Sequence, residues 1–262
     1  MKGELGFVKI KDRTVDSLRV EIFDTRAELG TQAGQDAAAC LRGLLREKET
    51  VNVMFAAAPS QNETLAALCA AEGIDWARVN AFHMDEYIGL NEDHPAGFRN
   101  FLRRAIFDRL PLGRVYLLNG GAKDAQAAAR EYEELLRAHP LDLCLCGIGE
   151  NGHLAFNDPP AADFEERALV KIVELDGTCR MQQVHDGCFE AIEQVPTHAL
   201  TATIPALFGA GKIVCSVPGP TKARAVREMI RGPIGTECPA SILRRHPDAV
   251  LYLDRDAGAQ LL

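Results

Sequence analysis

Short apolar runs recur along the chain and alternate with amphipathic stretches. Runs of this kind, rich in Val, Ile, Leu and Phe, are typical of strands that are buried on both faces of a parallel sheet. They are LRVEIF at 18–23, VNVMFA at 51–56, VNAFH at 79–83, VYLL at 115–118, DLCLCGIG at 142–149, KIVCSV at 212–217 and AVLYLD at 249–254. The alternation predicts an α/β fold with a mostly parallel sheet and helices on both of its faces.

The clearest amphipathic stretch is 124–139, which Asp124 can cap and Pro140 ends. Its apolar stripe consists of Ala128, Tyr132, Leu135 and Leu136. No repeat or change of composition marks a linker, so we expect a single domain over 1–262. The least regular stretch, 157–190, is interpreted as a lid or surface excursion.

Composition and charge exclude several function classes. The chain has 262 residues, of which 47% are hydrophobic, and its net charge of −8 argues against a nucleic-acid-binding surface. No run reaches the roughly 18 apolar residues that a membrane span needs, and the N-terminal segment MKGELGFVKIKDR is unlike a signal peptide. We therefore expect a cytoplasmic protein that contacts neither nucleic acid nor membrane.

The cysteines and histidines do not have the spacing of a metal site. Most of the eight cysteines lie in apolar runs, where a free thiol packs as a small hydrophobe. Cys144 and Cys146 share one face of an apolar run, which favours packing over metal binding. The seven histidines are scattered, so the sequence predicts no metal.

Ligands of open parallel sheets bind beyond the carboxyl ends of the strands, so the segments that follow each strand carry most information. Four of them contain residues that can do chemistry. They are AAAPSQN at 56–62, MDEYIGL at 84–90, GIGENGHLAFNDP at 147–159 and PGPTK at 218–222.

The string GIGENG has the form GxGxxG of a dinucleotide-binding turn. That interpretation is weak, because the string lies past the middle of the chain and Pro159 and Pro160 interrupt any long helix after it. As a rigid turn, it presents His153 beside Asn157 and Asp158. Imidazole can accept and return a proton near neutral pH, although a lone loop histidine is often structural.

Two carboxylates, Asp85 and Glu86, follow the apolar run at 79–83. Adjacent acids can divide the roles of acid and base when their environments differ, but the segment taken alone favours a helix N-cap at Asp85. In AAAPSQN, backbone N–H groups and the Ser60 hydroxyl could hold a phosphate, or the segment could be a plain N-cap at Ser60 or Asn62. Lys222 lies in the first turn of a predicted helix, where a bound anion would compensate its charge.

Six segments together resemble the glucosamine-6-phosphate deaminase (isomerase) family. They occur in order over about residues 50–250 and are VNAFHMDEYIGL, DHPAGFRNFL, LDLCLCGIGENGHLAFNDP, TCRMQQV, QVPTHALTATIP and PGPTKARAV. The resemblance implies a Rossmann-like α/β domain and the conversion of glucosamine 6-phosphate and water to fructose 6-phosphate and ammonia. It implies no cofactor, and a homo-oligomer is possible.

The resemblance also implies roles for individual residues. Asp85 matches the enolisation base and His153 the residue that opens the sugar ring. Asn151 and Asp158 match residues that support that histidine. The implied substrate- and phosphate-binding residues are Ser60, Gln61, Glu86, Arg180 and Lys222.

Three departures from the family pattern make the preferred amino sugar uncertain. Asn151 stands where some members have Asp, Asp158 stands where Glu is common, and AAAPSQN lacks a Gly-Gly pair. Galactosamine-6-phosphate deaminase therefore remains an alternative. A 6-phosphogluconolactonase, whose relatives carry DER and ASLFP where this chain has DEY and AFNDP, and a non-catalytic sugar-phosphate sensor are further alternatives.

Overall fold

The computed structural model describes residues 9–262, so the first part of the N-terminal segment considered above lies outside the described residues. Within that range, eleven β-strands form two sheets. The strands are β1 (Lys11–Val15), β2 (Leu18–Ile22), β3 (Val51–Phe55), β4 (Val79–His83), β5 (Asp85–Tyr87), β6 (Arg114–Tyr116), β7 (Leu143–Cys146), β8 (Val170–Glu174), β9 (His198–Ala202), β10 (Lys212–Val217) and β11 (Ala249–Leu253).

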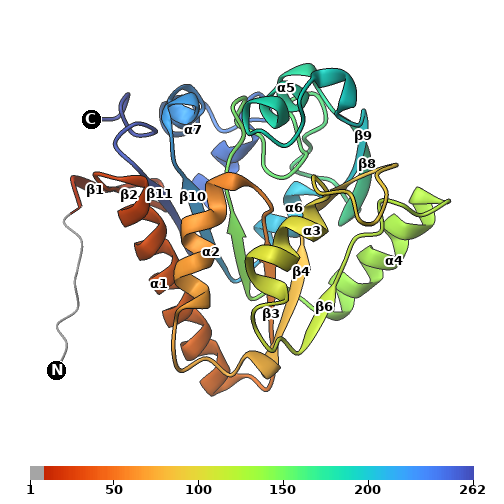
Figure 1. The fold of residues 1–262 in the computed structure, drawn as a ribbon. Coiled ribbons are helices and arrows are strands. Elements are labelled where there is room, and N and C mark those ends of the chain that lie inside the picture. The colour runs from red at the N-terminus through yellow and green to blue at the C-terminus, as the bar shows by residue number, and fades with distance from the viewer. Residues whose placement is uncertain (1–8) are drawn as a thin grey trace.

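The larger sheet has the strand order β1-β2-β11-β10-β7-β3-β4-β6. All of its neighbouring strands are parallel except the pair β1 and β2. The smaller sheet, β5-β9-β8, is antiparallel. In Figure 1 the strands β8 and β9 and the helix α5 lie at the top of the molecule, near the carboxyl ends of the parallel strands.

Helices cover both faces of the larger sheet, as the alternation of the sequence predicts. They are α1 (Arg26–Glu47), α2 (Asn62–Cys69), α3 (Phe98–Leu102), α4 (Ala125–Ala138), α5 (Gly177–His185), α6 (Ile204–Phe208) and α7 (Ala223–Arg231). Short helical turns are Pro59–Gln61, Trp76–Arg78, Arg103–Phe107, Ile192–Gln194, Pro220–Lys222 and Pro239–Arg245. Among residues 9–262, no helix is both long and apolar enough to cross a membrane.

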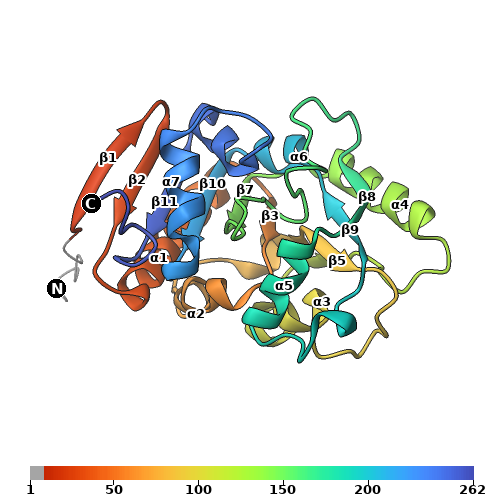
Figure 2. The same cartoon turned by 90° about the horizontal axis from the view of Figure 1, so that it is seen from above.

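Two apolar cores lie on opposite faces of the larger sheet. Val53 and Phe55 of β3 belong to the core beneath α1, α2 and α3, whereas Met54 belongs to the core beneath α4, α6 and α7. Successive side chains of a strand point to opposite faces, so a mostly apolar run is favoured when both faces are covered. Val214 of β10 and Val250 of β11 likewise belong to the core beneath α1, whereas Cys215 and Leu251 belong to the core beneath α7. Figure 2 views the molecule from above, with α7 passing in front of β10 and β11.

Local sequence signals explain where the two longest helices begin. Thr25 caps α1 through a capping box, in which its hydroxyl accepts from the Glu28 N–H at 3.2 Å and the Glu28 carboxylate accepts from the Thr25 N–H at 3.0 Å. Asp124 caps α4 by accepting from the Ala127 N–H at 2.9 Å. The predicted helix over 124–139 is thus confirmed, with its helical residues at 125–138.

The smaller sheet and the N-terminal strand β1 were not among the predicted strands. In particular, the stretch 157–190 is not irregular throughout, because it contains β8 and α5. The strand β5 has only three residues, and it is stabilised by pairing with β9, more than a hundred residues later in the chain. Such a partner cannot be recognised from local periodicity.

Close packing between α1 and α2 fixes the segment that enters α2 from the end of β3. An added Cβ at Gly34 would lie 2.6 Å from the Ala67 Cβ and 2.7 Å from the Thr64 carbonyl oxygen. Gly43, in the same helix, has nothing within 4 Å of such a Cβ. The two glycines therefore form a matched pair for a test of this packing.

Gly34→Ala is expected to destabilise the fold by about 1–2 kcal/mol, because overpacking outweighs the gain in helix propensity. Gly43→Ala is expected to stabilise it by up to about 1 kcal/mol, since only the propensity changes. Denaturant unfolding of the two variants and the parent protein measures both effects. Equal effects of the two substitutions would show that the contact between the helices is not tight at Gly34.

Candidate active site

A pocket lies beyond the carboxyl ends of β3, β4 and β7, where the strand pattern predicts a ligand site. Its polar lining comes from four separate segments and consists of Ser60, Gln61, Asp85, His153, Gln182 and Gln183. Its apolar lining includes Met84, Phe98, Ile148 and Phe156. Asp85 and His153, which are distant in the sequence, thus face one cavity.

Asp85 begins the short strand β5, which directly follows β4. Its side chain is only 6% exposed. Burial raises the pKa of its carboxyl group well above the ordinary value, and the charge of Glu86 raises it further. A carboxylate that is poorly solvated in this way is a stronger base than an exposed one when it is ionised.

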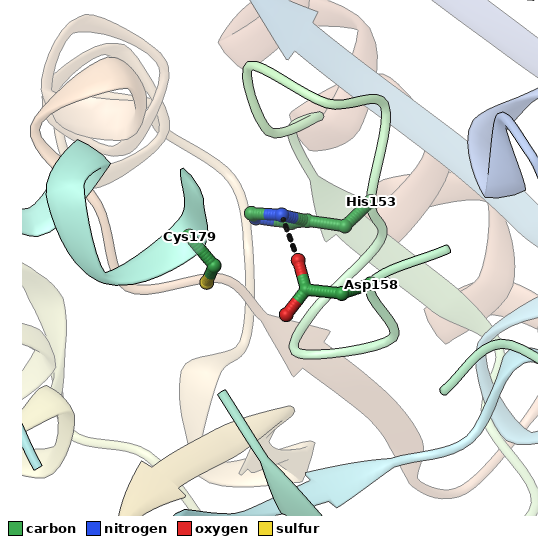
Figure 3. A group of neighbouring side chains, drawn as sticks. All are labelled: His153, Asp158 and Cys179. Atoms are coloured by element: carbon green, nitrogen blue, oxygen red, sulfur yellow. Dashed lines mark ion pairs between the residues drawn. The ribbon is translucent and has the colours of Figure 1, made fainter. Parts of the chain in front are cut away.

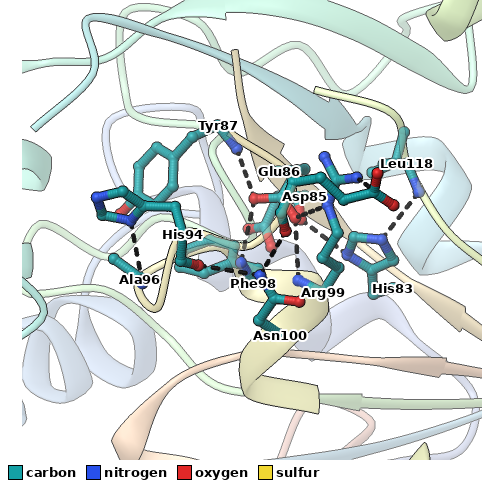
Figure 4. Close-up of polar contacts among 11 residues, drawn as sticks. His83, Asp85, Glu86, Tyr87, His94, Ala96, Phe98, Arg99, Asn100 and Leu118 are labelled. Carbon is teal, nitrogen blue, oxygen red and sulfur yellow. Dashed lines mark hydrogen bonds and ion pairs between the residues drawn. The ribbon is translucent and has the colours of Figure 1, made fainter. Parts of the chain in front are cut away.

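His83 holds the backbone at Asp85 in place. Its Nε2 accepts a hydrogen bond from the Leu118 N–H at 2.9 Å, so Nδ1 carries the proton and donates to the Asp85 carbonyl oxygen at 3.0 Å. Burial lowers the pKa of His83 to about 4, which keeps the ring neutral at neutral pH. Figure 4 shows His83 between Asp85 and Leu118.

Glu86 is not among the residues that line the pocket, and it organises the start of α3 (Figure 4). Its carboxylate accepts from the backbone N–H groups of Tyr87, Phe98 and Arg99 at 2.9–3.1 Å. It also accepts from Nε of Arg99 at 3.2 Å. With both oxygens engaged, Glu86 is placed to position Asp85 and α3, whereas the resemblance implied a contact with the substrate.

The loop after β7 brings His153 and Asp158 together. Nδ1 of His153 lies 2.8 Å from Oδ1 of Asp158, and both residues are buried. Burial by itself would raise the pKa of Asp158, but the close contact with His153 and its charge, together with a hydrogen bond from Asn151, lower that pKa overall. The carboxylate is therefore ionised and can orient the imidazole.

Asn151 connects the two ends of this loop. Its Oδ1 accepts from the His153 N–H at 3.1 Å, and its Nδ2 donates to Asp158 at 2.9 Å and to Asp176 at 3.3 Å. Gly149 is required by the same arrangement, because an added Cβ would lie 2.1 Å from the His153 ring. The glycine-rich string thus makes room for an imidazole beside the pocket.

Ser60 and Gln61 lie in the turn Pro59–Gln61 that leads into α2. The Gln61 amide donates to the Ser60 hydroxyl at 3.2 Å and to the Ser216 carbonyl oxygen at 3.1 Å. These bonds tie the turn to the end of β10. The turn therefore presents a fixed hydroxyl and its backbone to the pocket.

Lys222 ends the turn Pro220–Lys222 and directly precedes α7. Its side chain is 6% exposed, and among residues 9–262 its Nζ has no hydrogen-bond partner. Burial lowers its pKa, and the nearby carboxylates of Asp186 and Glu150 oppose this effect. A buried ammonium group without a hydrogen-bond partner is suited to an anionic ligand.

Arg180 does not line the pocket. Its guanidinium group donates to the carbonyl oxygens of Ile192 and Val195 at 2.7 and 2.9 Å and so ties α5 to the following turn. Gln182 and Gln183 of the same helix line the pocket instead. The helical spacing could have identified these two residues from the sequence, because Cys179, Gln182 and Gln183 are related by i, i+3 and i+4 and share one face of α5.

Comparisons with known proteins place this arrangement in a family. The family model of glucosamine-6-phosphate isomerases and 6-phosphogluconolactonases matches residues 24–252. A glucosamine-6-phosphate deaminase of Listeria welshimeri is 36% identical over 211 residues, which cover 80% of this chain and 88% of that protein. A glucosamine-6-phosphate deaminase of Enterococcus faecalis is 34% identical with the same coverage of both chains.

Solved structures agree with these sequence comparisons. A monomeric glucosamine-6-phosphate deaminase superposes with a TM-score of 0.83 and 29% identity, covering 92% of this chain and 98% of that chain. A 6-phosphogluconolactonase from Thermotoga maritima has a TM-score of 0.72 and 20% identity, covering 92% of this chain and 100% of that chain. The second likeness concerns the fold alone.

Proposed function

Because the chain belongs to the family of glucosamine-6-phosphate isomerases and 6-phosphogluconolactonases, we propose that it converts glucosamine 6-phosphate and water to fructose 6-phosphate and ammonia. Relatives named as glucosamine-6-phosphate deaminases, 34–36% identical over 80% of the chain, support the choice within the family. The observation that carries the proposed mechanism is the shared pocket of Asp85 and His153.

In the first proposed step, His153 opens the sugar ring. Its imidazole accepts the proton of the C1 hydroxyl and returns a proton to the ring oxygen as the bond between C1 and that oxygen breaks. The Asp158 carboxylate, 2.8 Å from Nδ1 of His153, orients the imidazole and stabilises the protonated form of the imidazole. This leaves Nε2 to face the sugar.

In the second step, the Asp85 carboxylate removes the proton from C2, and the electron pair forms the double bond between C1 and C2. Asp85 then delivers that proton to C1, which leaves an iminium group at C2. The proton that O1 gains is balanced by one that the C2 ammonium group loses. Water adds to C2 and ammonia leaves, so the hydrolysis consumes one water molecule.

The phosphate supplies binding energy that orients the reacting carbons. We assign it to the Ser60 turn and to Lys222, because the hydroxyl faces the pocket and the buried ammonium group has no other hydrogen-bond partner among the described residues. The amides of Gln182 and Gln183 are assigned to sugar hydroxyl groups. Neutral amides can donate to and accept from such groups.

A panel of three substrates tests this function. The purified protein is incubated separately with glucosamine 6-phosphate, galactosamine 6-phosphate and 6-phosphogluconolactone, and ammonia, ketose phosphate and acid are measured. We expect ammonia and fructose 6-phosphate in equal amounts from glucosamine 6-phosphate. Faster turnover of galactosamine 6-phosphate would replace glucosamine 6-phosphate as the assigned substrate. Hydrolysis of 6-phosphogluconolactone alone would replace deamination by lactone hydrolysis as the assigned reaction. Tight binding of a sugar phosphate without turnover would indicate a sensor.

Asp158→Asn is expected to lower kcat for glucosamine 6-phosphate about 10- to 100-fold with little change in KM, because a neutral amide stabilises the imidazolium form less well. Asp158→Glu should restore most of the activity, since the carboxylate is kept. The exposed Asp163, in the same loop, supplies the control Asp163→Asn. A kcat that is unchanged in Asp158→Asn would show that this carboxylate does not act through His153.

A further inference from the structure

Cys179 has no part in the proposed reaction, yet it lies beside the two groups that open the ring. It comes from α5, whereas His153 and Asp158 come from the loop after β7. A ring nitrogen of His153, a carboxylate oxygen of Asp158 and Sγ of Cys179 all lie within 4.8 Å of one another, and all three residues are buried. Figure 3 shows the thiol and the imidazole on two sides of the Asp158 carboxylate.

One imidazole nitrogen, one carboxylate oxygen and one thiol sulfur form a donor set that zinc prefers. Tetrahedral zinc with bond lengths of about 2.0–2.3 Å places its ligand atoms roughly 3–4 Å apart. Nδ1 of His153 and Oδ1 of Asp158 are 2.8 Å apart, and no separation within the group exceeds 4.8 Å, so the side chains must adjust their positions when the metal binds. Since His153 also lines the pocket, a fourth position would be open to solvent or substrate.

The surroundings of the three groups favour a cation. Oδ2 of Asp158 has no hydrogen-bond partner among residues 9–262, although it is buried. Burial raises the pKa of the Cys179 thiol, and the charges of Asp158, Asp85 and Asp176 raise it further.

We propose that His153, Asp158 and Cys179 bind one zinc ion that blocks the active site. Binding replaces the contact between His153 and Asp158 by bonds to the metal. The Cys179 thiol releases its proton to solvent, and Nδ1 of His153 loses its proton to solvent while Nε2 takes one up, so the bound imidazole stays neutral. The metal then occupies the nitrogen through which Asp158 orients the imidazole. Zinc is thus a reversible inhibitor of this chain, and Cys179 determines its sensitivity.

The metal binding is independent of the proposed function, whereas the inhibition rests on it. Zinc chloride is titrated into metal-free protein by calorimetry, and cobalt chloride is titrated separately while its absorption is recorded. We expect one high-affinity site and a thiolate-to-cobalt charge-transfer band. Cys179→Ala should remove the band and weaken zinc binding about 100-fold or more.

Two further variants make this test specific. Cys179→Ser keeps the size of the side chain and removes the sulfur, so it should also lose the charge-transfer band if the fold is retained. Cys188, a half-buried cysteine just beyond α5 that is not in the cluster, supplies the control Cys188→Ala, which should bind both metals as the parent protein does. Retention of the band in both Cys179 variants would overturn the proposal.

The activity assay tests the second half of the proposal. Zinc should abolish turnover by the parent protein, a chelator should restore it, and Cys179→Ala should turn over substrate at the parent rate in the presence of zinc. Equal inhibition of the parent protein and Cys179→Ala would refute the assignment. Zinc binding through Cys179 in a protein without deaminase activity would support the metal site and end the proposed function.

Discussion

Asp85→Asn is expected to lower kcat for glucosamine 6-phosphate about 10³-fold while KM stays within a few-fold of the parent value. The amide has nearly the same shape, but it cannot accept the C2 proton, and a positioned general base contributes roughly 10²- to 10⁴-fold. Steady-state assays of ammonia release measure the loss. The exposed cap residue Asp124 supplies the control Asp124→Asn, which should keep full activity.

Asp85→Asn is also expected to change the stability of the protein. This effect distinguishes a variant that has lost its catalytic base from a variant that has failed to fold. Because the folded-state pKa of Asp85 is raised, the folded chain binds more protons than the unfolded chain at pH values between the ordinary value near 4 and the raised one. The stability contributed by the neutral carboxyl group is therefore lost as pH rises through this window. Asp85→Asn keeps a neutral group at all pH values, so it should unfold at a higher temperature than the parent at neutral pH. A variant that retains the parent kcat would remove Asp85 from the mechanism.

Lys222→Met is expected to raise KM for glucosamine 6-phosphate about 100-fold, with a smaller change in kcat. The substitution removes the buried cation proposed to hold the phosphate, and loss of one partner of a desolvated charged pair costs about 2–5 kcal/mol. The exposed Lys123 supplies the control Lys123→Met. Competitive inhibition by inorganic phosphate should weaken in parallel with substrate binding.

The free Lys222→Met protein is also expected to be more stable than the parent. In the absence of ligand, the buried ammonium group has no hydrogen-bond partner among residues 9–262, so methionine of similar length removes a desolvation cost. Thermal unfolding without ligand measures this effect. An unchanged KM together with unchanged phosphate inhibition would place the phosphate elsewhere.

Much of the larger sheet could be predicted from the sequence, because its strands are buried on both faces and form continuous apolar runs. The run KIVCSV coincides with β10, and VNAFH coincides with β4. The smaller sheet could not be predicted in this way. The strand β5 has only three residues, and all three strands, β5, β8 and β9, carry charged or exposed residues and pair with distant segments.

The candidate site was predictable where residues directly follow parallel strands. Asp85 and Ser60 face the pocket from such positions, since the carboxyl ends of the strands meet at one edge of the sheet. The prediction was less informative within α5. Arg180 faces the helical turn at 192–194, whereas Gln182 and Gln183 face the pocket. Which side of α5 faces the pocket depends on how the helix packs against the rest of the protein, and the sequence of the helix alone does not determine this.

The central claim is that Asp85 and His153 act on one phosphorylated amino sugar. A crystal structure with a reduced, open-chain analogue of glucosamine 6-phosphate tests it most directly. We predict that the Asp85 carboxyl group lies against C1 and C2 and that His153 lies at the oxygen of C5, with the phosphate between the Ser60 turn and Lys222. An analogue bound so that either Asp85 or His153 does not touch the sugar would contradict the account.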